Sequence, residues 1–156
     1  MPRGPRSTLR LRARVAADLL KKLGLNVEIA ASDWGNLVIR QGSKAPVDKG
    51  GWNAFGTGAV GSDGLDPTLN PWLRTNGEAA RFGWPSDDEI EALRQQWIEA
   101  TDTPSRIELA AAIQARAFEV VPDIPTGQWA GQTADRKNLK GLMLGPALFQ
   151  WNVKKA

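Results

Sequence analysis

The residues best suited to holding a ligand lie in a glycine-rich run at positions 48–58. Trp52 and Phe55 supply flat apolar area, and Asn53 and Thr57 supply short polar side chains that can form hydrogen bonds. Glycine lets the backbone between them turn tightly or approach a bound molecule closely. The run therefore predicts a ligand-contacting surface. The alternative is that Trp and Phe pack into the core, which is their commoner use.

Several reactive residue types are absent from the chain. It has no Cys, no His and no Tyr, which excludes thiol nucleophiles, disulfides, Ser-His-Asp relays and the usual zinc or haem sites within this chain. Its oxygen donors are spread over helix starts and turns rather than gathered in a calcium loop. We therefore expect a protein that is not an enzyme and holds neither a metal nor a cofactor.

Two other chemistries are weighed and set aside. Residues 56–61 match the G-x-G-x-x-G pattern of dinucleotide sites, but the turn-rich residues 62–67 that follow cannot continue the helix such a site needs. Asp63 and Asp66 lie next to the aromatic run, and a glycosidase uses two carboxyl groups around a sugar stacked on Trp. Acids in a glycine-rich turn more often form turns or cap helices, and we assign these two to that role.

Charge and hydropathy exclude two further classes. Twenty Lys and Arg residues against 17 Asp and Glu residues give a formal net charge of +3 over 156 residues, a length that suits one domain. The excess is concentrated in an N-terminal arm containing Arg3, Arg6, Arg10, Arg12 and Arg14. No basic stripe continues beyond the arm, so we expect no nucleic-acid partner. No apolar segment follows it as in a secretory signal, and no later run is long enough to span a membrane.

The first half of the chain predicts a helix, a strand and a second helix. Apolar residues recur at helical spacing between Leu9 and Leu23, and Gly24 is placed to end that helix. Residues 25–30 alternate as in a half-buried strand. Ser32 or Asp33 can cap a short helix that Gly42 stops, and a short strand is expected at residues 52–55.

The second half predicts a helix pair. A short helix is expected from Asp66 to about Asn76, followed by a capping box at residues 86–89. The first helix of the pair would bury Ile90, Leu93, Trp97 and Ala100. The second, opened by Thr103 and Pro104, would present Ile107, Ala110, Ala111, Gln114, Ala117, Phe118 and Val121 on one face. A strand is expected at residues 124–129 and an extended, half-buried tail from Leu139.

The order of these motifs resembles a known family. The pieces that carry the resemblance are residues 14–28, Asp33-Trp34, Gly51-Trp52, Asp66-Pro67, Phe82-Gly83-Trp84-Pro85, Ala100-Thr101-Asp102, residues 121–125 and residues 139–142. Their succession over residues 14–155 is similar to the extracytoplasmic solute-binding proteins of ABC transporters, in the oligopeptide, dipeptide and nickel class (family 5). The chain matches only the last third or so of such proteins.

The resemblance implies an α/β fold, namely the partial second lobe of a type II periplasmic-binding-protein-like fold, with a small mixed sheet flanked by helices. Residues 1–13 would be an atypical Arg-rich arm and residues 14–136 part of the ligand-binding lobe. Residues 137–156 would be the C-terminal segment that in the family returns to the first lobe. The implied function is to bind a peptide-like or other small organic solute outside the cytoplasm and deliver it to an ABC permease.

The resemblance also implies the ligand contacts. In the family the segment that begins Gly-Trp lines the cleft, and peptide-binding members carry an acid three residues after that Trp. Phe55 stands there in this chain, which favours a less cationic or more apolar ligand. Lys49 sits where some relatives have an Arg facing a carboxylate, although an exposed loop Lys is the alternative. The expected contacts are Trp52, Asn53, Phe55, Thr57, Lys49, Trp34 and Gln128.

An alternative function stays open. A fragment that lacks the first lobe need bind no ligand and can self-associate through the surface that the lobe would cover. The apolar tail residues Leu142, Leu144, Phe149 and Trp151 would then pack across a homodimer interface, with or without the first helix.

Overall fold

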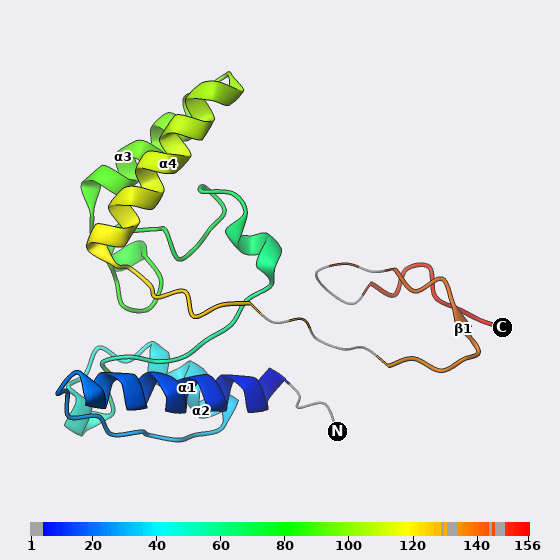
Figure 1. Ribbon diagram of the computed structural model, residues 1–156, viewed down its shortest axis with the longest axis horizontal. Helices are drawn as coiled ribbons and strands as arrows, with labels where there is room; N and C mark the ends of the chain where they lie inside the picture. Colours follow the sequence, from blue (N-terminus) through cyan, green and yellow to red (C-terminus); the bar gives the residue numbers. More distant parts are fainter. Residues whose placement is uncertain (1–4, 129, 131–133, 144, 146–148) are drawn as a thin grey trace. The chain divides into compact units, whose positions relative to one another are not determined.

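The computed structural model describes residues 5–128, 130, 134–143, 145 and 149–156, with side chains from residue 10 onward (Figure 1). The chain forms two compact units. The first comprises Met1–Gly58 with Trp129–Ala134, and the second comprises Ala59–Gln128 with Asp135–Ala156. Within the described residues, four α-helices, three short 3-10 helices and one two-stranded sheet make up the regular structure.

Helix α1, Pro5–Lys22, opens the first unit. The predicted helix is confirmed, and it begins before residue 9, so it runs through the expected boundary between residues 13 and 14. Gly24 follows at φ 87°, and its N–H donates to the carbonyl of Lys21, which ends the helix as expected. The buried position is Ala17, whereas Leu23 is exposed. The amphipathic face is therefore rotated from the predicted one.

Helix α2, Trp34–Gln41, follows in the same unit, and the 3-10 helix η1, Val47–Lys49, comes after it. Asp33 caps α2, because the backbone N–H of Asn36 donates to its carboxylate at 3.0 Å. That hydrogen bond holds the pKa of Asp33 below its ordinary value. Gly42 ends the helix as predicted, and of the two candidate caps the structure selects Asp33.

The strands expected outside the tail are absent, and this part of the prediction was wrong. Residues 25–30, 52–55 and 124–128 are not strands, and Trp129 lies outside the described residues. A strand exists only when a neighbouring strand accepts its hydrogen bonds. In the described part of the chain such a ladder joins β1, Leu139–Lys140, to β2, Lys154–Lys155, and nothing pairs with the other three segments. The small mixed sheet is thus replaced by a two-stranded antiparallel one.

A helix pair forms the core of the second unit. Helix α3, Asp88–Glu99, packs against helix α4, Thr103–Val120, as Figure 1 shows. Ile90 of α3 and Ile113 of α4 are 0% and 1% exposed. Leu93, Trp97 and Ala100 are half-buried on the same side of α3 as Ile90. The predicted pair and the predicted apolar stripe of its first helix are confirmed.

The stripe predicted for α4 is wrong. Ile107 and Phe118 are 64% and 70% exposed, whereas Ile113, which the predicted face omits, is buried. Alanines occur on both sides of this helix, so its apolar pattern does not single out one face. The buried face is instead determined by tertiary packing, and α4 packs against α3.

The start of α3 also differs from the predicted capping box. Asp87 rather than Ser86 is the cap, since the backbone N–H of Ile90 donates to the Asp87 carboxylate at 2.9 Å. Ser86 forms an isolated antiparallel bridge with Asn76. That backbone pairing occupies Ser86 and moves the helix start one residue onward. In α4, Asp102 caps in the same way by accepting from Ser105 at 2.9 Å.

The connection before α3 is a series of turns that includes the 3-10 helices η2, Gly61–Gly64, and η3, Gly77–Ala79. The short helix expected from Asp66 is therefore wrong. The Asp66 carboxylate accepts from the backbone N–H and the hydroxyl of Thr68 at 2.7 and 2.6 Å. This local turn competes with a helix, as Asp side chains often do.

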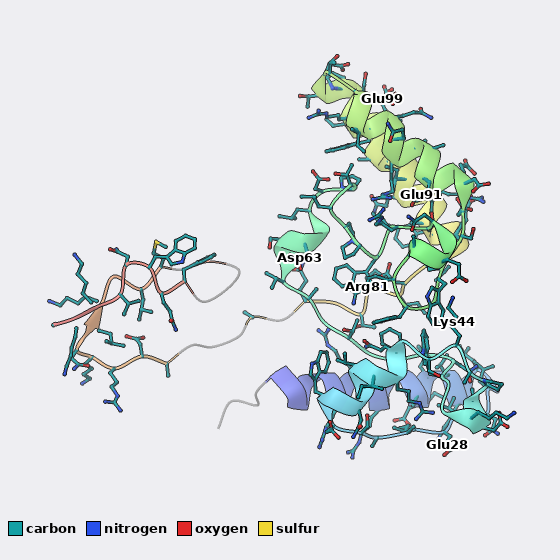
Figure 2. All side chains as sticks on the ribbon, turned by 180° about the vertical axis from the view of Figure 1, so that it is seen from behind. Glu28, Lys44, Asp63, Arg81, Glu91 and Glu99 are labelled. Atoms are coloured by element: carbon teal, nitrogen blue, oxygen red, sulfur yellow. The ribbon has the colours of Figure 1, made fainter. Side chains whose placement is uncertain are left out.

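A buried guanidinium fixes that connection to α3. Arg94, 7% exposed, donates from Nε to the carbonyl of Pro67 at 3.0 Å and from Nη2 to the carbonyl of Thr68 at 2.9 Å. Its Nη1 donates to both carboxylate oxygens of Glu91, which Figure 2 labels, at 2.9 and 2.8 Å. Every edge of the guanidinium is thereby satisfied, which is what makes burying it tolerable.

Thr75 extends this network and is almost completely buried. Its N–H donates to Glu91 Oε1 at 2.7 Å, and its hydroxyl donates to the carbonyl of Asp87 at 2.9 Å. The N–H of Asp87 returns a hydrogen bond to the Thr75 carbonyl. The loop is consequently paired with the first turn of α3.

The C-terminal residues form a short antiparallel pair, with Leu139 opposite Lys155 and a further bridge between Met143 and Phe149. The expected extended tail is confirmed for these residues. Phe149 is half-buried, whereas Trp151 is 84% exposed. Leu144 lies outside the described residues.

The ion pairs of Asp87 predict a pH-dependent stability. Arg116 donates to Asp87 at 2.7 Å and also contacts Glu89 and Glu119 at 3.1 and 2.9 Å. The hydrogen bond from Arg116, followed by that from Ile90, lowers the pKa of Asp87 below its ordinary 3.8. A lowered carboxyl pKa stabilises the fold above the unfolded-chain value and loses that contribution as the pH falls through the folded one.

We therefore expect the urea midpoint of the wild-type chain to fall between pH 7 and pH 3 by more than that of Asp87→Asn. The variant should also be the less stable of the two at pH 7. The exposed Asp63→Asn, in the same unit, is the control and should keep the wild-type pH slope. An Asp87→Asn profile parallel to wild type would show that this carboxylate contributes nothing to acid sensitivity.

Candidate functional site

The candidate loop at residues 48–58 is attached to the last turn of α2. Arg40 donates to the carbonyl of Gly51 from Nε at 3.1 Å and from Nη2 at 2.7 Å. Trp52 donates its indole N–H to the carbonyl of Gln41 at 3.1 Å. Two consecutive helix residues thus hold two consecutive loop residues. The carbonyls at a helix C-terminus lack intrahelical partners, which leaves that of Gln41 available to the indole.

Position 51 requires glycine. A Cβ there would lie 1.7 Å from the carbonyl oxygen of Ala45, which is a backbone atom that cannot swing away. The N–H of Gly51 donates to the carbonyl of Pro46, and Gly50 turns the chain at φ 91°. The turn at residues 45–51 is therefore closed on itself and presents Trp52 at a fixed point.

Trp52 and Phe55 form an edge-to-face aromatic pair. Their ring centroids lie 4.5 Å apart and the rings are inclined at 81°, a favoured aromatic geometry. Both side chains and that of Thr57 are half-buried, whereas Asn53 is exposed. The rings therefore support each other while each keeps part of its surface open, so neither is a fully buried core residue.

The remaining predicted contacts divide between the units. Lys49 ends η1 and is exposed, and Trp34 is the first residue of α2 and is also exposed. Both belong to the same unit as Trp52. Gln128 is exposed and belongs to the second unit. The structure thus brings six of the seven predicted contacts into one unit.

The first unit also contains an open hollow of about 540 Å³. It lies along one side of α2 and next to the candidate loop, and its lining residues are Ser32, Asn36, Ile39, Arg40, Ser43 and Gly50. None of these is among the predicted contacts. The polar residues at positions 32, 36, 40 and 43 recur at the three- and four-residue spacing of one helix side, which is the sequence signal that could have revealed them.

Gln41 adds a polar group beside the aromatic pair. Its side chain is buried, and within the described residues its Nε2 has no hydrogen-bond partner. A buried N–H group left without an acceptor costs about 1–3 kcal/mol. Since the carbonyl of the same residue receives the Trp52 indole, the orphaned donor lies in the residue that positions the aromatic pair.

The chemistries set aside from the sequence gain no support. The G-x-G-x-x-G run leads into η2, a four-residue 3-10 turn rather than a helix that could face a pyrophosphate. The Asp66 carboxylate is engaged by Thr68 and Leu69. No group of three or more acidic residues in the described ranges is arranged to hold a metal ion. Likewise, no described helix combines the length and hydropathy needed to cross a membrane.

Comparison with known proteins confirms the family resemblance. Over 144 residues the chain is 38% identical to a probable peptide ABC transporter periplasmic-binding protein of Sinorhizobium fredii (strain NBRC 101917 / NGR234). The match covers 92% of this chain and 27% of that relative, so the chain spans about a quarter of the relative's length. No family model matches the chain.

The close approach at Gly51 predicts a strong effect of one added methyl group. Gly51→Ala should lower the free energy of unfolding by roughly 1–3 kcal/mol, because the turn must open to accept the Cβ. Gly56→Ala is the matched control, since a Cβ there meets no atom within 4 Å, and should stay within about 0.5 kcal/mol of wild type. Urea unfolding followed by Trp fluorescence measures both. Equal midpoints would contradict the fixed turn.

Proposed function

We propose that this chain contributes ligand contacts to an extracytoplasmic solute-binding protein that delivers a peptide-like or other small organic ligand to an ABC permease. The observation that carries the proposal is the half-open pair of Trp52 and Phe55, held on α2 by Arg40 and Gln41. A rigid aromatic pair offers contact area at low entropic cost, as small-molecule sites require. The similarity to a probable peptide ABC transporter periplasmic-binding protein supports the ligand class.

The ligand chemistry follows from the residues around the pair. Asn53 and Thr57 provide hydrogen-bonding groups, and no acid stands among residues 49–62. A cationic amine therefore finds no counter-charge within this segment. The proposed ligand is apolar or weakly polar where it meets Trp52 and Phe55, and its capture involves no covalent step.

Affinity should be low for this chain by itself. Ligand sites usually enclose most of a small molecule's surface, and this chain covers 27% of the relative's length. Binding in the roughly millimolar range is therefore the expectation, equivalent to about 4 kcal/mol.

A tryptophan fluorescence titration with trileucine tests the proposal. The wild-type chain should give a saturable change, and Trp52→Ala should abolish it while leaving the fold intact. Trp97→Ala is the control, because Trp97 packs within the helix pair under the Arg106 guanidinium, 5.0 Å from its ring centroid. That variant should lose about 3 kcal/mol of stability and keep the ligand response. A response that survives in Trp52→Ala would remove this residue from the site.

A second candidate function is self-association, which the exposed face of α1 favours. Leu11, Val15, Leu19 and Leu23 recur every four residues and are 50–70% exposed. A continuous apolar stripe of this kind normally packs against another surface. We propose a second copy of the chain as its occupant, so that two α1 helices pack across a two-fold axis.

Light scattering coupled to size exclusion measures this association. The full chain should be a dimer, and the double variant Val15→Asp, Leu19→Asp should be a monomer of unchanged helix content. Ala13→Asp, which changes an exposed position on the other side of α1, should remain dimeric. A wild-type monomer at high concentration would refute the dimer.

A further inference from the structure

We propose that the outward face of α4 packs against α1 of a second copy, so that an apolar face bordered by acids meets an apolar stripe bordered by bases. The inference rests on the second candidate function, self-association, and names the surface that completes its interface. Around the two-fold axis the two α1 helices lie against each other, and each also contacts the partner's α4. The α1–α4 contact therefore occurs twice in the dimer.

The outward face of α4 lies on the other side of the helix from Ile113, the residue buried in the helix pair. Its members recur at alternating intervals of four and three residues, which is the spacing of a seam that receives another helix. Ile107 and Phe118 are 64% and 70% exposed. The face comprises five exposed residues, namely Ile107, Ala111, Gln114, Phe118 and Val121. All five belong to the stripe that the sequence predicts as a packing surface, so α4 carries one apolar face more than the helix pair uses.

Acidic residues border that face of α4. Glu108 and Glu119 are exposed, and each lies three or four residues from an exposed alanine, Ala111 or Ala115. Arg116 pairs with Glu119 at 2.9 Å, whereas Glu108 forms no ion pair within the described ranges. The surrounding residues 59–128 contain twelve acidic and five basic residues. A basic surface is therefore the occupant that charge favours.

The exposed apolar stripe of α1, from Leu11 to Leu23, has the opposite border. Arg14 and Lys22 are exposed, and each follows a leucine of the stripe by three residues, so it lies beside the stripe on the helix surface. Residues 5–22 contain six basic residues and one acid. Two α1 helices packed only on each other bring like charges together, which costs free energy. The acids beside the partner's α4 offset that cost.

The two helices also match in extent. Both α1 and α4 are 18 residues long, so their exposed faces can be buried along the whole contact. Successive members of the α1 stripe are four residues apart and shift by about 40° around the helix. The stripe consequently spreads over about 120°, which is wide enough to contact two neighbouring helices, as in a helix bundle.

The dissociation constant of the dimer, measured by sedimentation equilibrium, tests the apolar part of the contact. Ile107→Asp, Phe118→Asp should raise it at least about 30-fold with unchanged helix content, because both side chains are exposed within the single copy. Ile98→Asp is the control, since Ile98 is 55% exposed on α3 in the same unit. That variant should stay within about two-fold of wild type.

Charge reversal tests the choice of partner helix. Glu108→Lys, Glu119→Lys should raise the dissociation constant about ten-fold, and adding Arg14→Glu, Lys22→Glu should restore it to within about three-fold of wild type. Opposite charges then face each other again. Asp63→Lys, Glu99→Lys is the matched control, because both acids, labelled in Figure 2, are exposed residues of the second unit outside α4. It should change the constant by less than about two-fold.

The outcomes separate this interface from self-association in general. A wild-type dissociation constant in Ile107→Asp, Phe118→Asp would overturn the α1–α4 contact and leave the packing of α1 on α1 standing. Failure of the α1 charge reversal to rescue the α4 reversal would also overturn it. A wild-type chain that stays monomeric at high concentration would overturn self-association and this inference together.

Discussion

The buried guanidinium of Arg94 is the constraint on which the second unit depends. The connection before α3 is a series of turns, and Arg94 fixes it by donating to two of its carbonyls and to the Glu91 carboxylate at once. Glu91 then accepts from Thr75, whose hydroxyl reaches Asp87 at the helix cap. Removing one member would leave buried charge or donors unmatched, which is more costly than the net gain from forming the network.

Arg40 has a comparable structural role in the first unit, but its guanidinium forms fewer hydrogen bonds. It also fixes a loop to a helix through a backbone carbonyl, yet only one edge of its guanidinium is used. Arg94 is enclosed and fully matched, whereas Arg40 lines an open hollow. The contrast separates a structural arginine from one suited to binding, because spare donors at an accessible surface can exchange water for a ligand at little cost.

Local signals in the sequence predicted the parts of the fold that local physics determines. The helix pair, the stop at Gly24 and the stop at Gly42 follow from short-range patterns, and the structure contains all three. The strands expected at residues 25–30 and 52–55 do not form, since an alternating pattern shows only that a segment could pair and not that it has a partner. The prediction of the packed face of α4 failed for a similar reason, because burial of Ile113 depends on tertiary packing and not on the local sequence.

The same distinction between local and tertiary signals applies to the candidate site. Glycines and aromatics in one run pointed to the loop around Trp52, and glycine at position 51 proves to be required by the backbone of Ala45. The hollow was not predicted because its lining residues come from α2, from the chain on either side of that helix and from Gly50, and they are linked to the loop by the bond between Arg40 and Gly51. That bond joins positions eleven residues apart, so the spacing of the polar residues along α2 does not by itself connect the hollow with the loop.

Polar and apolar surfaces left open in the first unit have one physical feature in common. The stripe from Leu11 to Leu23 exposes apolar area, and Gln41 buries an amide nitrogen that no described residue accepts from. Each costs free energy as it stands, and contact with a second surface would lower that cost. A self-sufficient small domain would be expected to bury the first and pair the second. The first unit leaves both open and also holds a half-open aromatic pair beside a partly used arginine, and these are the surfaces on which the proposed contacts with a ligand and a second copy rest.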